Sequence, residues 1–124
     1  MKTERDLKKL LAGIDPELQN GEWVFCATPV PDALMTFRER EGITSIVERR
    51  RADELGLPYS LVSSWITLRI YSDLEAVGFI AVISTALAAK GISCNVVSAF
   101  HHDHLFVPAS RADEAMTILR RLSS

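Results

Sequence analysis

The sequence predicts an α+β fold with the ferredoxin-like order of elements, βαββαβ, on three observations. The run Ser64–Tyr71 alternates apolar and polar side chains, as a half-buried strand does. The segment Ala76–Lys90 is apolar at helical spacing. Two further strand-like runs, Ser93–Phe100 and His104–Val107, precede an amphipathic helix at the carboxyl end. From Trp65 onward, the order is therefore strand, helix, strand, strand, helix, which lacks only the last strand of the pattern.

The composition argues against several classes of protein. The chain has 124 residues, 48% of them hydrophobic and 24% charged, with a net charge of −2, which suits one compact core and argues against disorder and nucleic-acid binding. Its longest nearly uncharged stretch, Ala76–Ala89, is shorter than the roughly 20 residues that span a bilayer. Cys26 and Cys94 match no metal or redox spacing. Because no export signal is readable, we expect a cytoplasmic, reduced protein that contacts neither nucleic acid nor membrane.

Three helix starts share one pattern, a hydroxyl residue followed three positions later by an acid. The hydroxyl can accept a hydrogen bond from a free backbone N–H, and the acid favours the positive end of the helix. The pairs are Thr3 and Asp6, Ser72 and Glu75, and Ser110 and Asp113. The first and third are followed by apolar stripes, Leu7–Ile14 and Ala115–Leu122, which predict amphipathic helices.

The first half carries two short β-rich runs, Glu22–Thr28 and Gly42–Glu48. Between them, Pro29–Glu41 is interpreted as a loop with a short helix, and Arg50–Leu55 as another short helix that ends at Gly56. We expect this half to complete or extend the sheet of the second half, with a partner chain as the alternative source of the missing strand.

The middle helix, Ala76–Lys90, is apolar nearly all round, so it must be covered on more than one side. A sheet can cover one side, and a second helix, another half-domain or a partner subunit the other. Gly91 is expected to close this helix. The tripeptide His101-His102-Asp103 then predicts a tight turn between antiparallel strands, with Asp103 as a turn residue, and Pro108 is expected to stop the second strand.

Two stretches of sequence resemble the ACT-domain family. Ser72–Phe79 followed by Gly91–Pro108 closely resembles the carboxy-terminal ACT domain of small bacterial stand-alone tandem-ACT proteins. More weakly, Phe37–Thr44 after Trp23–Cys26 resembles their divergent first half. The resemblance implies two ACT-like halves with antiparallel sheets and helices on one face. It divides the chain into residues 1–59, an amino-terminal helix plus the divergent half, and residues 60–124, the carboxy-terminal ACT domain.

The resemblance also implies a function. ACT domains bind small effectors, usually amino acids, at interfaces between paired domains, so we expect a non-enzymatic regulatory protein, a homodimer, with an amino acid bound between ACT halves and no cofactor. The alternative is an oligomerisation or interaction module without a ligand, built on the twice-covered helix.

The turn Tyr71–Phe79 is the main candidate for a binding site. A helix amino terminus presents free N–H groups that suit an α-carboxylate, and Gly78 lets a ligand approach the backbone. The competing interpretation is that Ser72 and Glu75 only cap the helix and that Gly78 only relieves packing. By position in the ACT family, the ligand-binding residues are Asp73, Leu74, Glu75, Ala76, Val77, Gly78, Asn95, Val96 and Val97, with Asp103 as a secondary candidate.

The sequence gives little support for metal binding, catalysis or phosphate binding. The cluster His101-His102-Asp103-His104 could offer two aligned metal ligands at most, so a structural, interface or pH-sensitive role is favoured and no metal site is expected. No nucleophile elbow surrounds Ser98 and no phosphate loop occurs, so we expect no catalytic residues. Trp23 and Trp65 are interpreted as core or interface anchors, and the arginine run 49–51, balanced by nearby acids, as a solvated surface.

Overall fold

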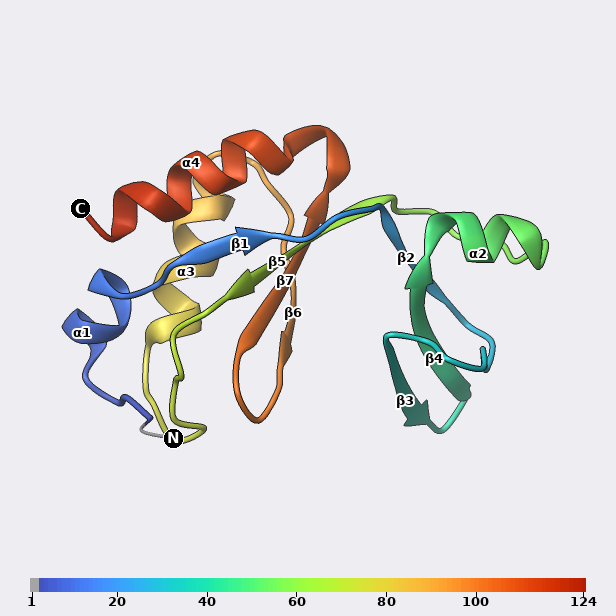
Figure 1. Ribbon diagram of the computed structural model, residues 1–124, viewed down its shortest axis with the longest axis horizontal. Coiled ribbons are helices and arrows are strands. Elements are labelled where there is room, and N and C mark those ends of the chain that lie inside the picture. Colours follow the sequence, from blue (N-terminus) through green and yellow to red (C-terminus); the bar gives the residue numbers. More distant parts are fainter. Residues whose placement is uncertain (1–2) are drawn as a thin grey trace.

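One bent antiparallel sheet runs through residues 3–124, the part of the chain that the computed structural model describes (Figure 1). Its strands lie in the order β3-β4-β2-β5-β7-β6, and β1 also pairs with β5. The strands are β1 (Pro16–Leu18), β2 (Trp23–Cys26), β3 (Met35–Glu39), β4 (Gly42–Glu48), β5 (Ser63–Leu68), β6 (Asn95–Ser98) and β7 (Asp103–Pro108). The helices are α1 (Leu7–Ala12), α2 (Arg49–Glu54), α3 (Phe79–Ala88) and α4 (Ala112–Leu122), the last preceded by the 3-10 turn Ala109–Arg111.

The carboxy-terminal lobe is a complete ferredoxin-like unit whose fourth strand is β1. In the order β1-β5-β7-β6, β1 pairs with β5 from Pro16 opposite Leu68 to Leu18 opposite Ile66. The missing strand therefore comes from the same chain, not from a partner. The sequence did not reveal β1 because three residues that include a proline are too few for a periodic pattern.

Three helices cover one face of this lobe. Leu10 of α1, Ile83 of α3 and Leu119 of α4 are fully buried in one cluster with Ile66 of β5 and Leu105 of β7. Complete burial of an aliphatic side chain contributes roughly 1.5–3 kcal/mol, so these contacts hold the lobe together. Helix α3 contacts both α1 and α4, so the second helix that its sequence required is present.

The amino-terminal lobe, made of β2, β3, β4 and α2, is smaller, and within residues 3–124 its one helix, α2, packs against β2 and β4 (Figure 1). Val24, Cys26 and Val47 of the sheet pack with Ala52 of α2 in a second buried cluster. The expected strands 22–28 and 42–48 and the expected short helix at 50–55 are present with small shifts of their ends.

The interpretation of Pro29–Glu41 as a loop with a short helix was wrong in part, because residues 35–39 form β3. This strand pairs with β4 from Met35 opposite Ile46 to Glu39 opposite Gly42. It is an edge strand with almost no buried side chain, so no apolar periodicity betrays it. Backbone pairing with β4, a tertiary contact, decides its conformation.

The three expected hydroxyl caps were also wrong. Asp6, not Thr3, caps α1 by accepting a hydrogen bond from the Lys9 N–H at 3.1 Å. Helix α4 follows a 3-10 turn, and its N-cap Arg111 makes no capping bond through its side chain. Helix α3 begins only at Phe79, and its N-cap is Gly78 with a left-handed φ of 91°.

Asp103 is not a turn residue, contrary to expectation. The turn spans Ala99 to His102, and the Ala99 N–H donates to the His102 carbonyl at 3.0 Å. Asp103 is the first residue of β7, opposite Ser98 and Leu68, and it is buried. Pro108, expected to stop the strand, is its last residue.

Among residues 3–124, no helix has the length and apolar character needed to cross a membrane.

Candidate functional site

The bend between β5 and α3 encloses a small cavity of about 160 Å³. Five residues that the sequence singled out line it: Asp73, Leu74, Ala76, Gly78 and Asp103. Ser72, Phe79, Ile80, Ala81 and Ser98 complete the lining. We call this cavity the turn pocket. Its residues come from the bend, from α3 and from the adjacent ends of β6 and β7, so two segments far apart in sequence meet there.

The other candidate residues lie elsewhere. Glu75 is exposed and is paired with Arg5, and Val77 is 83% exposed. Asn95 and Val97 lie on the helix-free face of the sheet, opposite Phe106 and His104, whereas Val96 packs against the core under the helices. The alternation of a strand explains this division, because neighbouring residues point to opposite faces.

Asp73, one of the two acids that line the turn pocket, already has partners. Asp73 accepts hydrogen bonds from the Glu75 N–H at 2.8 Å and the Thr3 hydroxyl at 3.1 Å. The Arg5 guanidinium lies 3.1 Å from Asp73 and 2.7 Å from Glu75. The backbone N–H of Glu75, and then Arg5, lower the pKa of Asp73. A cationic group of a ligand would therefore have to compete with Arg5 for this carboxylate.

The amino-terminal segment lies along the bend. The Glu4 N–H donates to the Tyr71 carbonyl at 2.8 Å, and the Asp73 N–H donates to the Glu4 carbonyl at 2.9 Å. Leu7 of α1 lies against Gly78: a Cβ atom added to this glycine would be 3.7 Å from the Leu7 side chain. The segment thus flanks the turn pocket without lining it, since none of its residues belongs to the lining.

The pocket also holds free donors at the start of α3. Gly78 offers no side-chain cap, so the first N–H groups of this ten-residue helix have no side-chain acceptor. Phe79, Ile80 and Ala81, which carry these groups, line the pocket. Beside them, the buried Asp103 accepts a hydrogen bond from the Ser72 hydroxyl at 3.0 Å. The cavity is therefore lined both by residues with free N–H donors and by two carboxylates.

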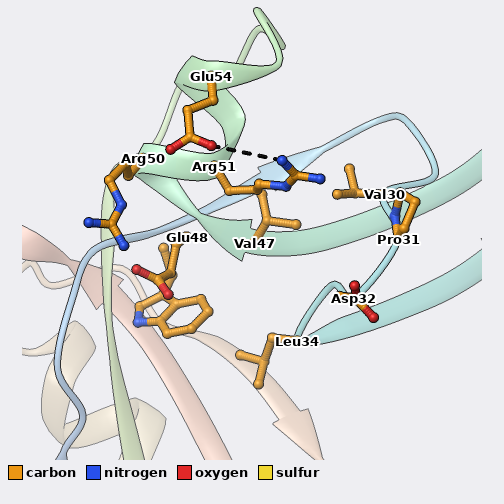
Figure 2. A pocket seen from close by; sticks show the side chains of 10 residues that line it. Val30, Pro31, Asp32, Leu34, Val47, Glu48, Arg50, Arg51 and Glu54 are labelled. Atoms are coloured by element: carbon orange, nitrogen blue, oxygen red, sulfur yellow. Dashed lines mark ion pairs between the residues drawn. The ribbon is translucent and has the colours of Figure 1, made fainter.

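A second, larger cavity lies in the amino-terminal lobe and was not predicted (Figure 2). It measures about 470 Å³ and lies between α2, the end of β4 and the loop that leads into β3. We call it the α2 pocket. Its lining combines charged residues of both signs with apolar ones: Trp23, Val30, Pro31, Asp32, Leu34, Val47, Glu48, Arg50, Arg51 and Glu54. The arginines of this run are exposed, as expected, and Arg50 and Arg51 also line the cavity. No local pattern could reveal a cavity assembled from three separate stretches of the chain.

The helix-free face of the sheet carries a hydrogen-bonded aromatic cluster. The Trp65 indole N–H donates to Nδ1 of His104 at 3.0 Å, and the Thr67 hydroxyl lies at the same distance from that nitrogen. Because the indole can only donate, His104 is neutral and carries its proton on Nε2. Burial, and then the nearby His102, lower the pKa of His104. A structural role for this histidine agrees with the sequence, and within residues 3–124 no group of three or more His, Cys, Asp or Glu residues is arranged to hold a metal.

This arrangement predicts a loss of stability in mild acid. The folded-state pKa of His104 lies below its ordinary value of 6.5, so protonation of this side chain disfavours the folded state. The stability that depends on neutral His104 is therefore fully present above pH 6.5 and is lost as the pH falls below that value. Urea unfolding at about pH 7.5 and pH 5.5 should show a lower free energy of unfolding at the lower pH. His104→Gln, which keeps an acceptor for Trp65 but does not titrate, should flatten the difference. An equal pH dependence in the variant would assign the effect to other groups.

The fold is that of a small ferredoxin-like module with a pocket at the amino terminus of a helix. ACT-domain family models match residues 2–64 and residues 60–121 in tandem. The chain belongs to the ACT-domain family, and the resemblance and the ferredoxin-like fold expected from the sequence are both confirmed. ACT domains are regulatory modules.

Solved structures agree. A Vibrio cholerae protein of unknown function, described as a possible transport protein, is 38% identical over 95% of this chain and 96% of its own, with a TM-score of 0.86. An Agrobacterium tumefaciens protein has a TM-score of 0.72 at 16% identity, covering 87% of each chain. The ligand-free regulatory subunit of aspartate kinase from Thermus thermophilus has a TM-score of 0.65 at 10% identity, covering 89% of this chain and 97% of its own. A search of curated proteins found no match.

Proposed function

We propose that this chain is a non-enzymatic ACT regulatory protein that binds an amino acid in the turn pocket, where two copies of the chain meet. The observation that carries the proposal is the meeting of uncapped N–H groups of α3 with Asp73 and Asp103 around one cavity. An α-carboxylate is suited to the helix amino terminus, and an α-ammonium is suited to the carboxylates. Binding of amino acids by ACT domains in general, and the likeness to an aspartate kinase regulatory subunit, support the class of ligand.

The surface around the pocket supports a second copy as the partner. Leu74, which lines the cavity, is 66% exposed, and Val77 on the same bend is 83% exposed. Apolar side chains so exposed at the mouth of a cavity are typical of an interface. A ligand that contacts both copies would stabilise the dimer through its higher affinity for the paired state, which is the physical basis of regulation here.

A thermal-shift screen with the twenty amino acids tests the proposal. At roughly 100 times Kd, a ligand stabilises the folded state by about 2.7 kcal/mol, so at least one amino acid should raise Tm clearly. Ala81→Leu should abolish the shift, because Ala81 is an exposed helical residue whose enlarged side chain would fill the pocket. Gly78 is a poorer probe, since its left-handed backbone makes any substitution strained.

Two further variants complete the experiment. Ala88→Leu, on the same helix but outside the pocket, is the matched control and should keep the shift. Arg5→Ala removes the competing guanidinium from Asp73 and should strengthen binding. A shift that persists in Ala81→Leu would exclude the turn pocket. Flat traces for every amino acid at millimolar concentration, from a protein that elutes as a stable dimer, would instead favour the ligand-free interaction module.

A further inference from the structure

The α2 pocket exists because β3 is shorter than β4 at one end. Strand β3 begins at Met35 opposite Ile46, so Val47 and Glu48 of β4 have no partner in β3. Helix α2 begins at the next residue, Arg49, and packs against β2 and β4. The loop that precedes β3 curves along the open side of the hollow, so the cavity has walls on three sides (Figure 2).

The wall formed by this loop is held in place. Buried Ser45 of β4 accepts a hydrogen bond from the Val30 N–H at 3.1 Å and donates one to the Thr28 carbonyl at 2.7 Å. At the other end, the Leu34 N–H donates to the Ile46 carbonyl at 2.8 Å. Between these anchors, Asp32 has a left-handed φ of 62°. Its position is therefore set by the loop before any ligand arrives.

Three charged groups of the lining have no ion-pair partner within residues 3–124. Arg51 is paired with Glu54 at 3.8 Å, but no side-chain hydrogen bond or salt bridge engages Asp32, Glu48 or Arg50 in that part of the chain. Figure 2 shows Glu48 and Arg50 toward one end of the hollow and Asp32 toward the other. The groups without a partner in the described part of the chain are therefore the Arg50 guanidinium and the Glu48 carboxylate toward one end of the cavity and the Asp32 carboxylate toward the other.

We propose that the α2 pocket binds a basic amino acid. Its α-carboxylate would pair with Arg50, its α-ammonium with Glu48, and the cation at the end of its side chain with Asp32. Trp23, Leu34 and Val47 line the same cavity and offer apolar contacts to the aliphatic part of that side chain. A volume of about 470 Å³ suits a molecule of this size. The site is separate from the turn pocket and does not depend on the function proposed for it.

Three probes with related structures test each group. L-lysine carries all three charges, L-norleucine lacks the side-chain cation, and 1,5-diaminopentane lacks the carboxylate. Each is titrated into the full-length protein labelled with nitrogen-15, and the backbone amide signals of Val47, Arg50 and Arg51 and the indole N–H of Trp23 are followed by NMR. Lysine should shift these signals saturably at millimolar concentration or below, and each of the other two should bind about tenfold more weakly.

Variants assign the contacts. Asp32→Asn, which tolerates the left-handed backbone, should reduce lysine affinity about tenfold and leave norleucine affinity unchanged. Arg50→Ala should weaken both amino acids and leave diaminopentane unchanged. Arg120→Ala removes an exposed arginine of α4 outside the pocket and should change nothing.

The turn pocket is separated from this test by Ala81→Leu, which should bind lysine at the α2 pocket as the unmodified protein does. Absence of saturable shifts at the four reporter groups, shifts confined to the turn pocket, or an unchanged lysine affinity in Asp32→Asn would each overturn the assignment. Because the two pockets share no residue, either can fail while the other stands.

Discussion

Replacing Phe106 by alanine is expected to lower the free energy of unfolding by about 3–5 kcal/mol. Phe106 is 1% exposed although it lies on the helix-free face of the sheet. Its ring packs edge-on against Phe25 of the amino-terminal lobe, with centroids 5.5 Å apart, and is stacked on Trp65 at 6.3 Å. Truncation would leave a void where the two lobes join.

The effect should extend beyond stability, because Phe106 is one of the aromatic contacts that join the lobes, beside the Trp23–Trp65 pair with centroids 5.2 Å apart. Strands β2 and β5 pair only at Trp23 and Ser63, where the Ser63 hydroxyl also donates to the Trp23 carbonyl at 2.6 Å. Urea unfolding followed by circular dichroism and by tryptophan fluorescence measures both the loss and any separation of the two transitions. Phe37→Ala is the control, since Phe37 is 63% exposed and should cost less than about 1 kcal/mol. Equal losses in the two variants would contradict the role given to Phe106.

Ser45→Ala is expected to cost about 1–3 kcal/mol. The Ser45 side chain is fully buried and serves both the Val30 N–H and the Thr28 carbonyl. Alanine would leave these two backbone groups without that partner in a place that water does not easily reach. Denaturant unfolding measures the loss, and hydrogen exchange at the Val30 amide should become faster.

Ser84→Ala provides the matched control for Ser45. Its hydroxyl donates to the Ile80 carbonyl inside α3, where that carbonyl already belongs to the helix. Removing it should leave stability unchanged within about 0.5 kcal/mol. If Ser45→Ala were as mild, or if the Val30 amide exchanged at its original rate, the loop that carries Asp32 would be held by other contacts.

The carboxy-terminal lobe could be predicted from sequence because its elements are long and periodic. The alternation of Ile66 and Leu68 with Trp65 and Thr67 identifies β5 and even its helix-covered face, as the burial of both aliphatic residues confirms. By contrast, β1 is too short and β3 too exposed to leave a pattern. Both strands exist through pairing with β5 or β4, which a local reading of the chain does not detect.

The candidate site was predictable only in part, for a related reason. The bend after β5 is marked by Ser72, Asp73 and Gly78, and these residues do line a cavity. The sequence could not show that Arg5 is paired with Asp73 across the amino-terminal segment, because that contact joins residues far apart in the chain. Strand alternation alone separates Asn95 and Val97 from Val96, but the sequence does not show which of the two faces the helices cover.

Because β1 pairs with β5, the carboxy-terminal lobe is built from two stretches of the chain that are separated by the whole amino-terminal lobe. The polypeptide first lays down α1 and one strand of the carboxy-terminal lobe, leaves to build the whole amino-terminal lobe, and only then returns with β5. A fragment beginning at residue 60 would keep α3 and α4 but lose that strand and α1, so β5 would present a bare edge. The carboxy-terminal lobe therefore cannot be excised as one continuous segment of the chain.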